Sequence, residues 1–366
     1  MKKITPDIWQ LHELLNQWFH QHQRYMPWRD NQDPYRIWIS EIMLQQTRVE
    51  TVLPYFINFI SRYASVQALA GANEQDVMKL WEGLGYYARA RNLIRGALRV
   101  VEHFKGKIPC TYKELCSIPG IGDYTAGAIL SIAFNMPVPA VDGNVLRVIA
   151  RLYAVEKDVT KLNVKSEIRA LVSSIIPDGH ASSFNQGLME LGAMICTPKS
   201  PKCNICPWYL ICVSRILNLQ YRLPLKTPKK PVQVVRRIIA VIFDGQRVLV
   251  HKRPSKGLLG GLWEFPGWEF AEDQKQSITN KLLQIGIITH KVLPIIEVQH
   301  TFTHLCWNMS GFLCITDASI VKVEENHEYR WVLPEELHDL PFPVAFKQFV
   351  LWAIESLPGF IHPVDL

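Results

Sequence analysis

The chain has 366 residues, of which 48% are hydrophobic and 20% charged, so it has the composition of a soluble globular protein and exceeds the length of one ordinary core. No apolar run reaches membrane length, and the first residues lead into an amphipathic helix rather than a signal peptide, which predicts a cytoplasmic protein. Basic residues outnumber acidic ones by 24 to 18 in residues 1–215 and by 6 to 0 in residues 216–237, whereas residues 238–366 hold 10 against 15. This distribution suits a polyanionic partner, although a net charge of +7 also serves solubility alone.

The first part of the chain reads as almost wholly helical, and the last part as a mixture of strands and helices. We therefore expect an all-α domain over 1–215, a basic linker over 216–236 with prolines and no acid before Arg236, and an α+β domain over 237–366. Apolar spacing predicts helices over 6–22, 37–46, 49–63, 74–82, 86–104, 111–117, 123–135, 143–152, 163–175 and 181–194. Strands are predicted over 237–243, 248–252, 295–301 and 305–314, with helices over 272–283 and 344–357.

A carboxylate stands among apolar residues in the run Ser40 to Arg48. Glu41 and Gln45 are four residues apart, so they share one face of a helix. Burial would raise the pKa of such a glutamate and let it deliver a proton near neutral pH. The ordinary alternative is an exposed glutamate on a helix surface.

A glycine turn, Ile118-Pro119-Gly120-Ile121-Gly122, leads into the predicted helix 123–135. Glycines permit positive φ and a close backbone approach, and free N–H groups at a helix start attract phosphate. This pattern is typical of the hairpin of a helix-hairpin-helix, whose amides hold a DNA backbone, and the alternative is an ordinary turn. Asp142 then precedes another helix, where it could serve simply as the N-cap.

Four cysteines cluster with the spacing C-x6-C-x2-C-x5-C, which in a cytosolic protein implies metal rather than disulfides. Zinc is the simplest metal for four thiolate ligands, but the spacing lacks the paired C-x2-C symmetry of many structural zinc sites. The clustered residues are Cys196, Cys203, Cys206 and Cys212.

These motifs together resemble the helix-hairpin-helix-Gly/Pro-Asp DNA glycosylases, and the run Ser-Glu-Ile-Met-Leu-Gln-Gln-Thr at 40–47 is similar to that of the MutY adenine glycosylases. The resemblance implies that Glu41 protonates the departing adenine and that Asp142 stabilises the oxocarbenium-like sugar. Asn144 would orient Asp142 or the attacking water. Tyr124 stands where related endonuclease-III-like enzymes carry a lysine nucleophile, so the resemblance implies a monofunctional glycosylase.

The resemblance also implies how the base leaves the stack. Gln46 and Tyr86 match family residues that insert into the duplex, although an aromatic core is the ordinary use of the Trp81–Tyr87 region. The approach to the adenine pocket would be formed by Arg24, Met26, Trp28 and Arg29.

The cysteine spacing matches the [4Fe–4S] loop of the endonuclease-III superfamily, so the resemblance favours an iron–sulfur cluster. The run Leu258 to Gly267 resembles the entry to a Nudix domain, but the following residues lack the acidic helix that binds Mg²⁺ there. The implied role of this domain is recognition of 8-oxoguanine through a loop at Phe302, Thr303 and His304, in which Thr303 replaces the family's serine. A strand end with a packed phenylalanine is the alternative.

The sequence thus predicts an adenine DNA glycosylase of base-excision repair that acts on double-stranded DNA carrying A:8-oxoguanine or A:G mispairs. We expect a bacterial protein that works at the nucleoid as a monomer, without contacting a membrane. An endonuclease-III-type pyrimidine glycosylase/lyase is the nearest alternative, disfavoured by Tyr124 and the second domain. A non-catalytic mismatch sensor is disfavoured by the pair Glu41 and Asp142, and a nucleotide pyrophosphohydrolase by the missing acidic helix.

Overall fold

The computed structural model describes residues 7–228, 231–270, 272–302, 305–316 and 328–359. The chain divides into two compact units, each built from two segments. The first unit comprises Met1–Ala72 and Asn92–Pro228, and the second comprises Asn73–Arg91 and Lys229–Leu366. We describe each unit by itself.

The first unit is helical, and the second begins with one helix of its own, α5 (Glu74–Leu80), followed by the start of α6. Many of the helices start at a side-chain cap, as α2 does at Asp33, whose carboxylate accepts a hydrogen bond from the Tyr35 amide. The helices of the first unit are α1 (Ile8–His22), α2 (Pro34–Leu44), α3 (Val49–Arg62), α4 (Val66–Ala70), α6 (Ala88–Phe104), α7 (Tyr112–Cys116), α8 (Asp123–Phe134), α9 (Gly143–Leu152), α10 (Leu162–Ser173), α11 (Ala181–Met194), η1 (Cys203–Ile205) and α12 (Val213–Ile216).

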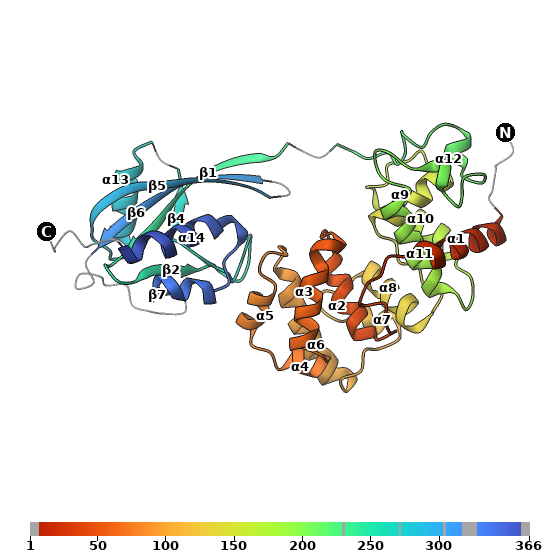
Figure 1. Ribbon diagram of the computed structural model, residues 1–366, viewed down its shortest axis with the longest axis horizontal. Helices are drawn as coiled ribbons and strands as arrows, with labels where there is room; N and C mark the ends of the chain where they lie inside the picture. Colours follow the sequence, from red (N-terminus) through yellow and green to blue (C-terminus); the bar gives the residue numbers. More distant parts are fainter. Residues whose placement is uncertain (1–6, 229–230, 271, 303–304, 317–327, 360–366) are drawn as a thin grey trace. The chain divides into compact units, whose positions relative to one another are not determined.

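Helix α8 is buried almost all round, because its residues from Thr125 to Ile132 are apolar or small. It packs against both α2 and α11, and Figure 1 draws it between them. A helix that is apolar on every side belongs in a core rather than at a surface. Helix α8 therefore carries the hairpin at its N-terminus on a rigid support.

The segment that follows α8 returns close against it. A Cβ at Gly127 would lie 2.3 Å from the Pro139 carbonyl oxygen, so only glycine allows this approach. The buried Asn185 side chain of α11 accepts a hydrogen bond from the Ala140 amide at 2.9 Å and donates one to the Val138 carbonyl at 3.2 Å. These contacts fix the backbone two residues before Asp142.

The second unit contains a mixed sheet with strand order β3-β2-β1-β6-β5, where β4 also pairs with β1 and β7 with β2. Its strands are β1 (Gln233–Phe243), β2 (Val248–Lys252), β3 (Trp263–Glu264), β4 (Gly267–Glu269), β5 (Thr289–Thr301), β6 (Leu305–Thr316) and β7 (Tyr329–Val332). Its later helices are α13 (Gln274–Gln284), η2 (Pro334–Asp339), η3 (Val344–Phe346), α14 (Lys347–Ser356) and η4 (Leu357–Gly359).

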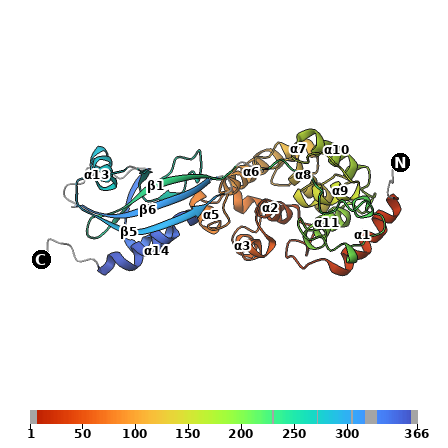
Figure 2. The same cartoon turned by 90° about the horizontal axis from the view of Figure 1, so that it is seen from above.

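Helices cover both faces of this sheet, as Figure 2 shows with α13 and α14 on opposite sides of β1, β5 and β6. Ile278 and Leu282 of α13 pack with Ile238 and Ile242 on one face, and Phe349 of α14 belongs to the core on the other. Strands β1 and β6 run parallel, in register from Gln233 opposite Leu305 to Phe243 opposite Ile315. The unit is thus an α+β sandwich around one sheet, as the sequence predicted.

Most expected helices and strands are present, with differences at their ends. Strand β1 begins at Gln233 instead of 237 and β5 at Thr289 instead of 295, because exposed strand ends lack the apolar alternation that marks a buried strand. The short elements α4, β3 and β4 were not predicted, since they are too short to show periodicity. Among the described residues, no helix combines the length and apolarity needed to cross a lipid bilayer.

Candidate active site

A cavity of about 1100 Å³ lies in the first unit, between the N-terminal ends of α8 and α9 and the helices α2 and α11. Every site residue that the sequence predicted in this unit, apart from the cysteines, lines it. These residues are Arg24, Met26, Trp28, Arg29, Glu41, Gln46, Gly120, Gly122, Tyr124, Asp142 and Asn144. Residues distant in sequence are thus brought to one space large enough for a nucleoside.

Glu41 projects into this cavity from the buried face of α2 and is only 4% exposed. Burial raises the pKa of its carboxyl to about 7, opposed by a hydrogen bond that the Tyr124 hydroxyl donates to Oε2 at 2.5 Å. The negative charge of Asp142 raises this pKa further, and the Arg29 guanidinium lowers it. The side chain can therefore hold a proton near neutral pH and release it to a bound base.

Asp142 is the N-cap of α9, and it also lines the cavity. Its Oδ1 accepts hydrogen bonds from the amides of Asn144 at 2.9 Å and Val145 at 2.7 Å, and its Oδ2 accepts one from Asn144 Nδ2 at 2.8 Å. Burial raises the pKa of Asp142, and these hydrogen bonds oppose that rise. The two interpretations of Asp142 are compatible, because one carboxylate caps the helix and faces the cavity.

Asn144 is itself held in place by Arg147, whose Nη2 donates to Asn144 Oδ1 at 2.8 Å and to the Gly192 carbonyl at 2.8 Å. The side-chain amide of Asn144 therefore has its oxygen taken by Arg147 and its nitrogen directed to Asp142. This geometry supports an orienting effect of Asn144 on Asp142.

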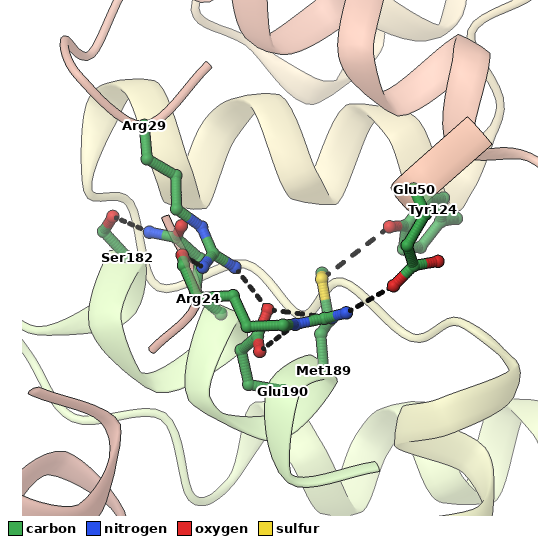
Figure 3. A network of polar contacts seen from close by, with 8 residues as sticks. Arg24, Arg29, Glu50, Tyr124, Ser182, Met189 and Glu190 are labelled. Carbon is green, nitrogen blue, oxygen red and sulfur yellow. Dashed lines mark hydrogen bonds and ion pairs between the residues drawn. The ribbon is translucent and has the colours of Figure 1, made fainter. Parts of the chain in front are cut away.

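Glu190 is a cavity residue that sequence reasoning missed. It lies on α11, is 2% exposed, and holds two arginines that were predicted (Figure 3). Arg24 Nε donates to its Oε2 at 2.9 Å and Arg29 Nη2 to its Oε1 at 3.0 Å. Residues 181–194 contain one charged residue, and a lone acid in a buried helix was a signal that could have found it.

The hairpin also lies at this cavity. Gly120 has φ +85°, and a Cβ there would lie 2.8 Å from Asn92 Cβ, so both the conformation and the space require glycine. Gly122 is the N-cap residue of α8 and has no side chain to occupy the first free N–H groups. The turn predicted from the glycines is present, with amides at a helix start beside the two carboxylates.

The family of the chain is settled by comparison with known proteins. Residues 39–174 match the family described as HhH-GPD superfamily base excision DNA repair protein, and residues 238–352 match the NUDIX domain. An adenine DNA glycosylase of Buchnera aphidicola (subsp. Schizaphis graminum) is 37% identical over 78% of this chain and 84% of that protein. The adenine DNA glycosylase of Homo sapiens is 33% identical over 91% of this chain and 72% of that protein. The chain belongs to the adenine DNA glycosylase family.

Solved structures agree with the fold of this glycosylase. A thermostable thymine-DNA glycosylase is 29% identical and covers 56% of this chain and 94% of its own, with a TM-score of 0.52. A non-covalent endonuclease III–DNA complex is 21% identical with a TM-score of 0.50, covering 59% of this chain and all of that one, and it shows the fold alone.

The two residues of the glycosylase that were predicted to insert into DNA share an unusual backbone. Gln46 has φ 61° and Tyr86 has φ 50°, and residues other than glycine rarely adopt such a positive φ. Tyr86 is 44% exposed, whereas its neighbour Tyr87 is buried in the core. The resemblance indicated Tyr86 rather than Tyr87 for insertion, and of these two tyrosines Tyr86 is the exposed one.

The four clustered cysteines of the glycosylase line one small cavity of about 30 Å³ together with Arg151. Arg151 Nη1 donates to Cys196 Sγ at 3.3 Å and to the Thr197 carbonyl at 2.7 Å. Burial raises the pKa of the Cys206 thiol to about 12, and neighbouring cysteines add to this rise. Burial also raises the pKa values of the Cys203 and Cys212 thiols, and neighbouring cysteines add to the rise. A positively charged partner would favour the ionised form of these thiols.

In the second unit, Phe302 is part-buried, and its ring meets Trp307 edge-on with the ring centroids 4.9 Å apart. The other two predicted lesion-reading residues, Thr303 and His304, lie outside the described residues. Helix α13, which follows the Nudix-like entry, contains no aspartate or glutamate. The acidic Mg²⁺ helix of a pyrophosphohydrolase is therefore missing here, as the sequence suggested.

Proposed function

We propose that this protein removes adenine from A:8-oxoguanine and A:G mispairs in double-stranded DNA, as the names of its relatives suggest for the base. The observation that carries the proposal is that Glu41, with a pKa near 7, and the Asp142 carboxylate face one nucleoside-sized cavity. Cleavage of an N-glycosidic bond needs an acid for the leaving base and a negative charge near the sugar. The two side chains meet both needs.

In this mechanism the target adenosine leaves the helix and enters the cavity. Protonated Glu41 gives its proton to a ring nitrogen of adenine while the bond to the sugar breaks. Asp142 stabilises the resulting oxocarbenium-like cation, and a water molecule then attacks the sugar to leave an abasic site. Asn144 holds Asp142 in position, while Gln46 and Tyr86 fill the space that the base left.

The same proposal makes the enzyme monofunctional. Cleavage of the strand by a lyase needs an amine that forms a Schiff base with the sugar. The hairpin position carries Tyr124, whose hydroxyl is bound to Glu41 and whose pKa burial raises well above its usual value. A phenol in this state is no nucleophile for the sugar.

We also propose that the four cysteines hold a [4Fe–4S] cluster. The thiols share one cavity, and their C-x6-C-x2-C-x5-C spacing lacks the paired symmetry of many structural zinc sites, which favours the iron–sulfur group over zinc. Cys203 at the start of η1, Cys206, Cys212 at the start of α12, and Cys196 would hold such a cluster, and Arg151 of α9 donates a hydrogen bond to Cys196 Sγ. Purified protein that lacks visible absorbance and carries one zinc per chain would contradict this assignment.

The remaining expectations belong to the same proposal. Residues 1–215 form the glycosylase domain, 216–236 the linker, and 237–366 the domain that senses the base opposite adenine through Phe302, Thr303 and His304. The excess of basic residues before 238 supports DNA as the partner. We propose a monomer that works at the bacterial nucleoid.

The direct test is a duplex oligonucleotide with one A:8-oxoguanine pair, incubated with enzyme in excess and then cleaved with alkali. We expect cleavage at the adenine after alkali and little without it. Glu41→Gln and Asp142→Asn should each lower the single-turnover rate by about 10²–10⁴-fold while the duplex still binds. Strand nicking without alkali at the rate of base release would show a lyase, and release of a pyrimidine would favour the endonuclease-III alternative.

A further inference from the structure

Helix α8 begins with an acid, Asp123, directly after the hairpin. Its side chain is 77% exposed, and the residue lines the large cavity together with Gly120, Gly122 and Lys165. The N-terminus of a helix attracts anions, so a free carboxylate at this place would repel a DNA phosphate and compete with it for the same amides. An acid directly after a hairpin that binds DNA therefore needs an explanation.

Two side chains from other helices hold this carboxylate by both oxygens. Oδ1 accepts a hydrogen bond from the Tyr112 hydroxyl of α7 at 2.6 Å, and Oδ2 forms an ion pair with Arg169 Nη1 of α10 at 3.2 Å. The Arg169 guanidinium also lies 5.2 Å from the centre of the Tyr112 ring. The carboxylate is thus neutralised and its direction is fixed from two sides.

From this geometry we propose that Arg169 and Tyr112 are positioning residues for DNA binding. They keep the Asp123 carboxylate bound to themselves, so the hairpin amides stay free for a phosphate of the DNA backbone. The inference rests on the proposed glycosylase function and adds the residues that make its hairpin receptive to DNA. The Asp123 side chain is 77% exposed and that of Arg169 29% exposed. Ion pairs that solvent reaches add little to folding, so loss of Arg169 should act on binding more than on the fold.

The competing interpretation is that Arg169 contacts a phosphate itself. Both interpretations predict weaker binding for Arg169→Ala, but they differ when Asp123 is changed as well. If Arg169 acts by neutralising Asp123, Asp123→Asn restores binding to the Arg169→Ala protein. If Arg169 binds phosphate directly, the loss persists in the double variant.

The experiment measures the affinity of the full chain for an unmodified, lesion-free duplex by fluorescence anisotropy at several salt concentrations. Arg169→Ala should weaken binding by about 3- to 10-fold at low salt, with a smaller defect at high salt because screening weakens the repulsion. Adding Asp123→Asn should return the affinity to within about twofold of the wild type. Tyr112→Phe should weaken binding less, because the ion pair remains.

Removal of any acid from a DNA-binding protein raises affinity somewhat, so the rescue needs a matched control. Glu167 also lies on α10 and pairs with Lys157 at 2.8 Å, outside the cavity lining. Glu167→Gln in the Arg169→Ala background should restore little. Thermal melting of each variant separates unfolding from loss of binding.

The proposal is overturned if Asp123→Asn rescues no better than Glu167→Gln, or if Tyr112→Phe weakens binding more than Arg169→Ala does. Because the probe duplex carries no lesion, the result is independent of base release. Failure of the wild type to release adenine would overturn the proposed function and leave the result on Asp123 standing.

Discussion

At the residue scale, the proposed mechanism depends on the proton on Glu41. Since the pKa of its carboxyl is raised to about 7, the acid is protonated below that pH and loses its proton above it. The single-turnover rate of base release should therefore fall as the pH rises beyond about 7. A rate that stays constant from pH 6 to about 9 would show that Glu41 is not the acid.

The Tyr124 hydroxyl allows a sharper version of this test. Its hydrogen bond favours the ionised form of Glu41, so Tyr124→Phe should raise the pKa of Glu41 and move the alkaline fall in rate to higher pH. Tyr35→Phe is the matched control. Tyr35 lies on α2 with Glu41, and its buried hydroxyl donates a hydrogen bond to the Tyr63 carbonyl outside the cavity lining. The control should leave the pH profile in place.

The residues in and near the cavity differ in how easily a sequence reveals their roles. Motif similarity indicated Glu41, Tyr124 and Asp142, since their neighbours along the chain form recognisable runs. Glu190 and Arg169 do not stand in a recognisable motif. Each one pairs with a residue more than 45 positions away in the chain. Such pairings depend on how helices pack, which spacing within one helix does not encode.

At the element scale, substitutions of Asp142 can separate its role as the N-cap of α9 from its proposed role in catalysis. Asparagine caps a helix as well as aspartate does, whereas alanine at an N-cap costs about 0.5–2 kcal/mol. Because burial raises the pKa of Asp142, its ionised form also disfavours the folded state at neutral pH, and the neutral amide of the Asp142→Asn variant would remove that cost.

We therefore expect Asp142→Asn to release the base about 10²–10⁴-fold more slowly but to be at least as stable as the wild type in urea unfolding. Asp142→Ala should be similarly slow and less stable. If the two variants unfold at the same urea concentration, the hydrogen bonds to Asn144 and Val145 do not stabilise α9. If Asp142→Asn retains activity, the carboxylate is not needed for catalysis.

The hairpin offers a second test at this scale. Gly120→Ala forces an alanine into φ +85° and against Asn92, so we expect lower thermal stability and about tenfold weaker binding to duplex DNA. Gly122→Ala is the matched control, since its φ is −102° and no atom lies within 4 Å of the added Cβ. Equal effects of both changes would contradict the assigned conformations.

At the scale of the whole molecule, the two predicted domains carry opposite net charge and, in the proposed function, have different tasks. Residues 1–237 hold the basic surplus, whereas residues 238–366 are acidic. A sequence can show this division through composition, but the grouping of Asn73–Arg91 with the sheet-containing unit depends on contacts between distant segments. The short strands β3, β4 and β7 were not predicted because two to four residues show no periodicity.

The division of tasks predicts separable kinetics. Phe302→Ala should lower the rate on A:8-oxoguanine toward the rate on A:G and leave the A:G rate nearly unchanged, because base removal takes place in the other unit. Phe270→Ala is a suitable control, as Phe270 is also part-buried and packs under Arg236. Comparison of the two rates in single-turnover reactions checks this, and an equal loss on both mispairs would exclude Phe302 from lesion recognition.

The close approach of Gly127 to Pro139 has a consequence for substrate choice. In the proposed mechanism it links the hairpin, which would hold the DNA backbone, to Asp142, which would act on the sugar. The Asn185 side chain fixes this link by its hydrogen bond with the Ala140 amide. The protein thus fixes the distance between the phosphate bound at the hairpin and the sugar in the cavity. A DNA strand whose backbone is lengthened between the bound phosphate and the target sugar should therefore carry the right base and still present it out of reach.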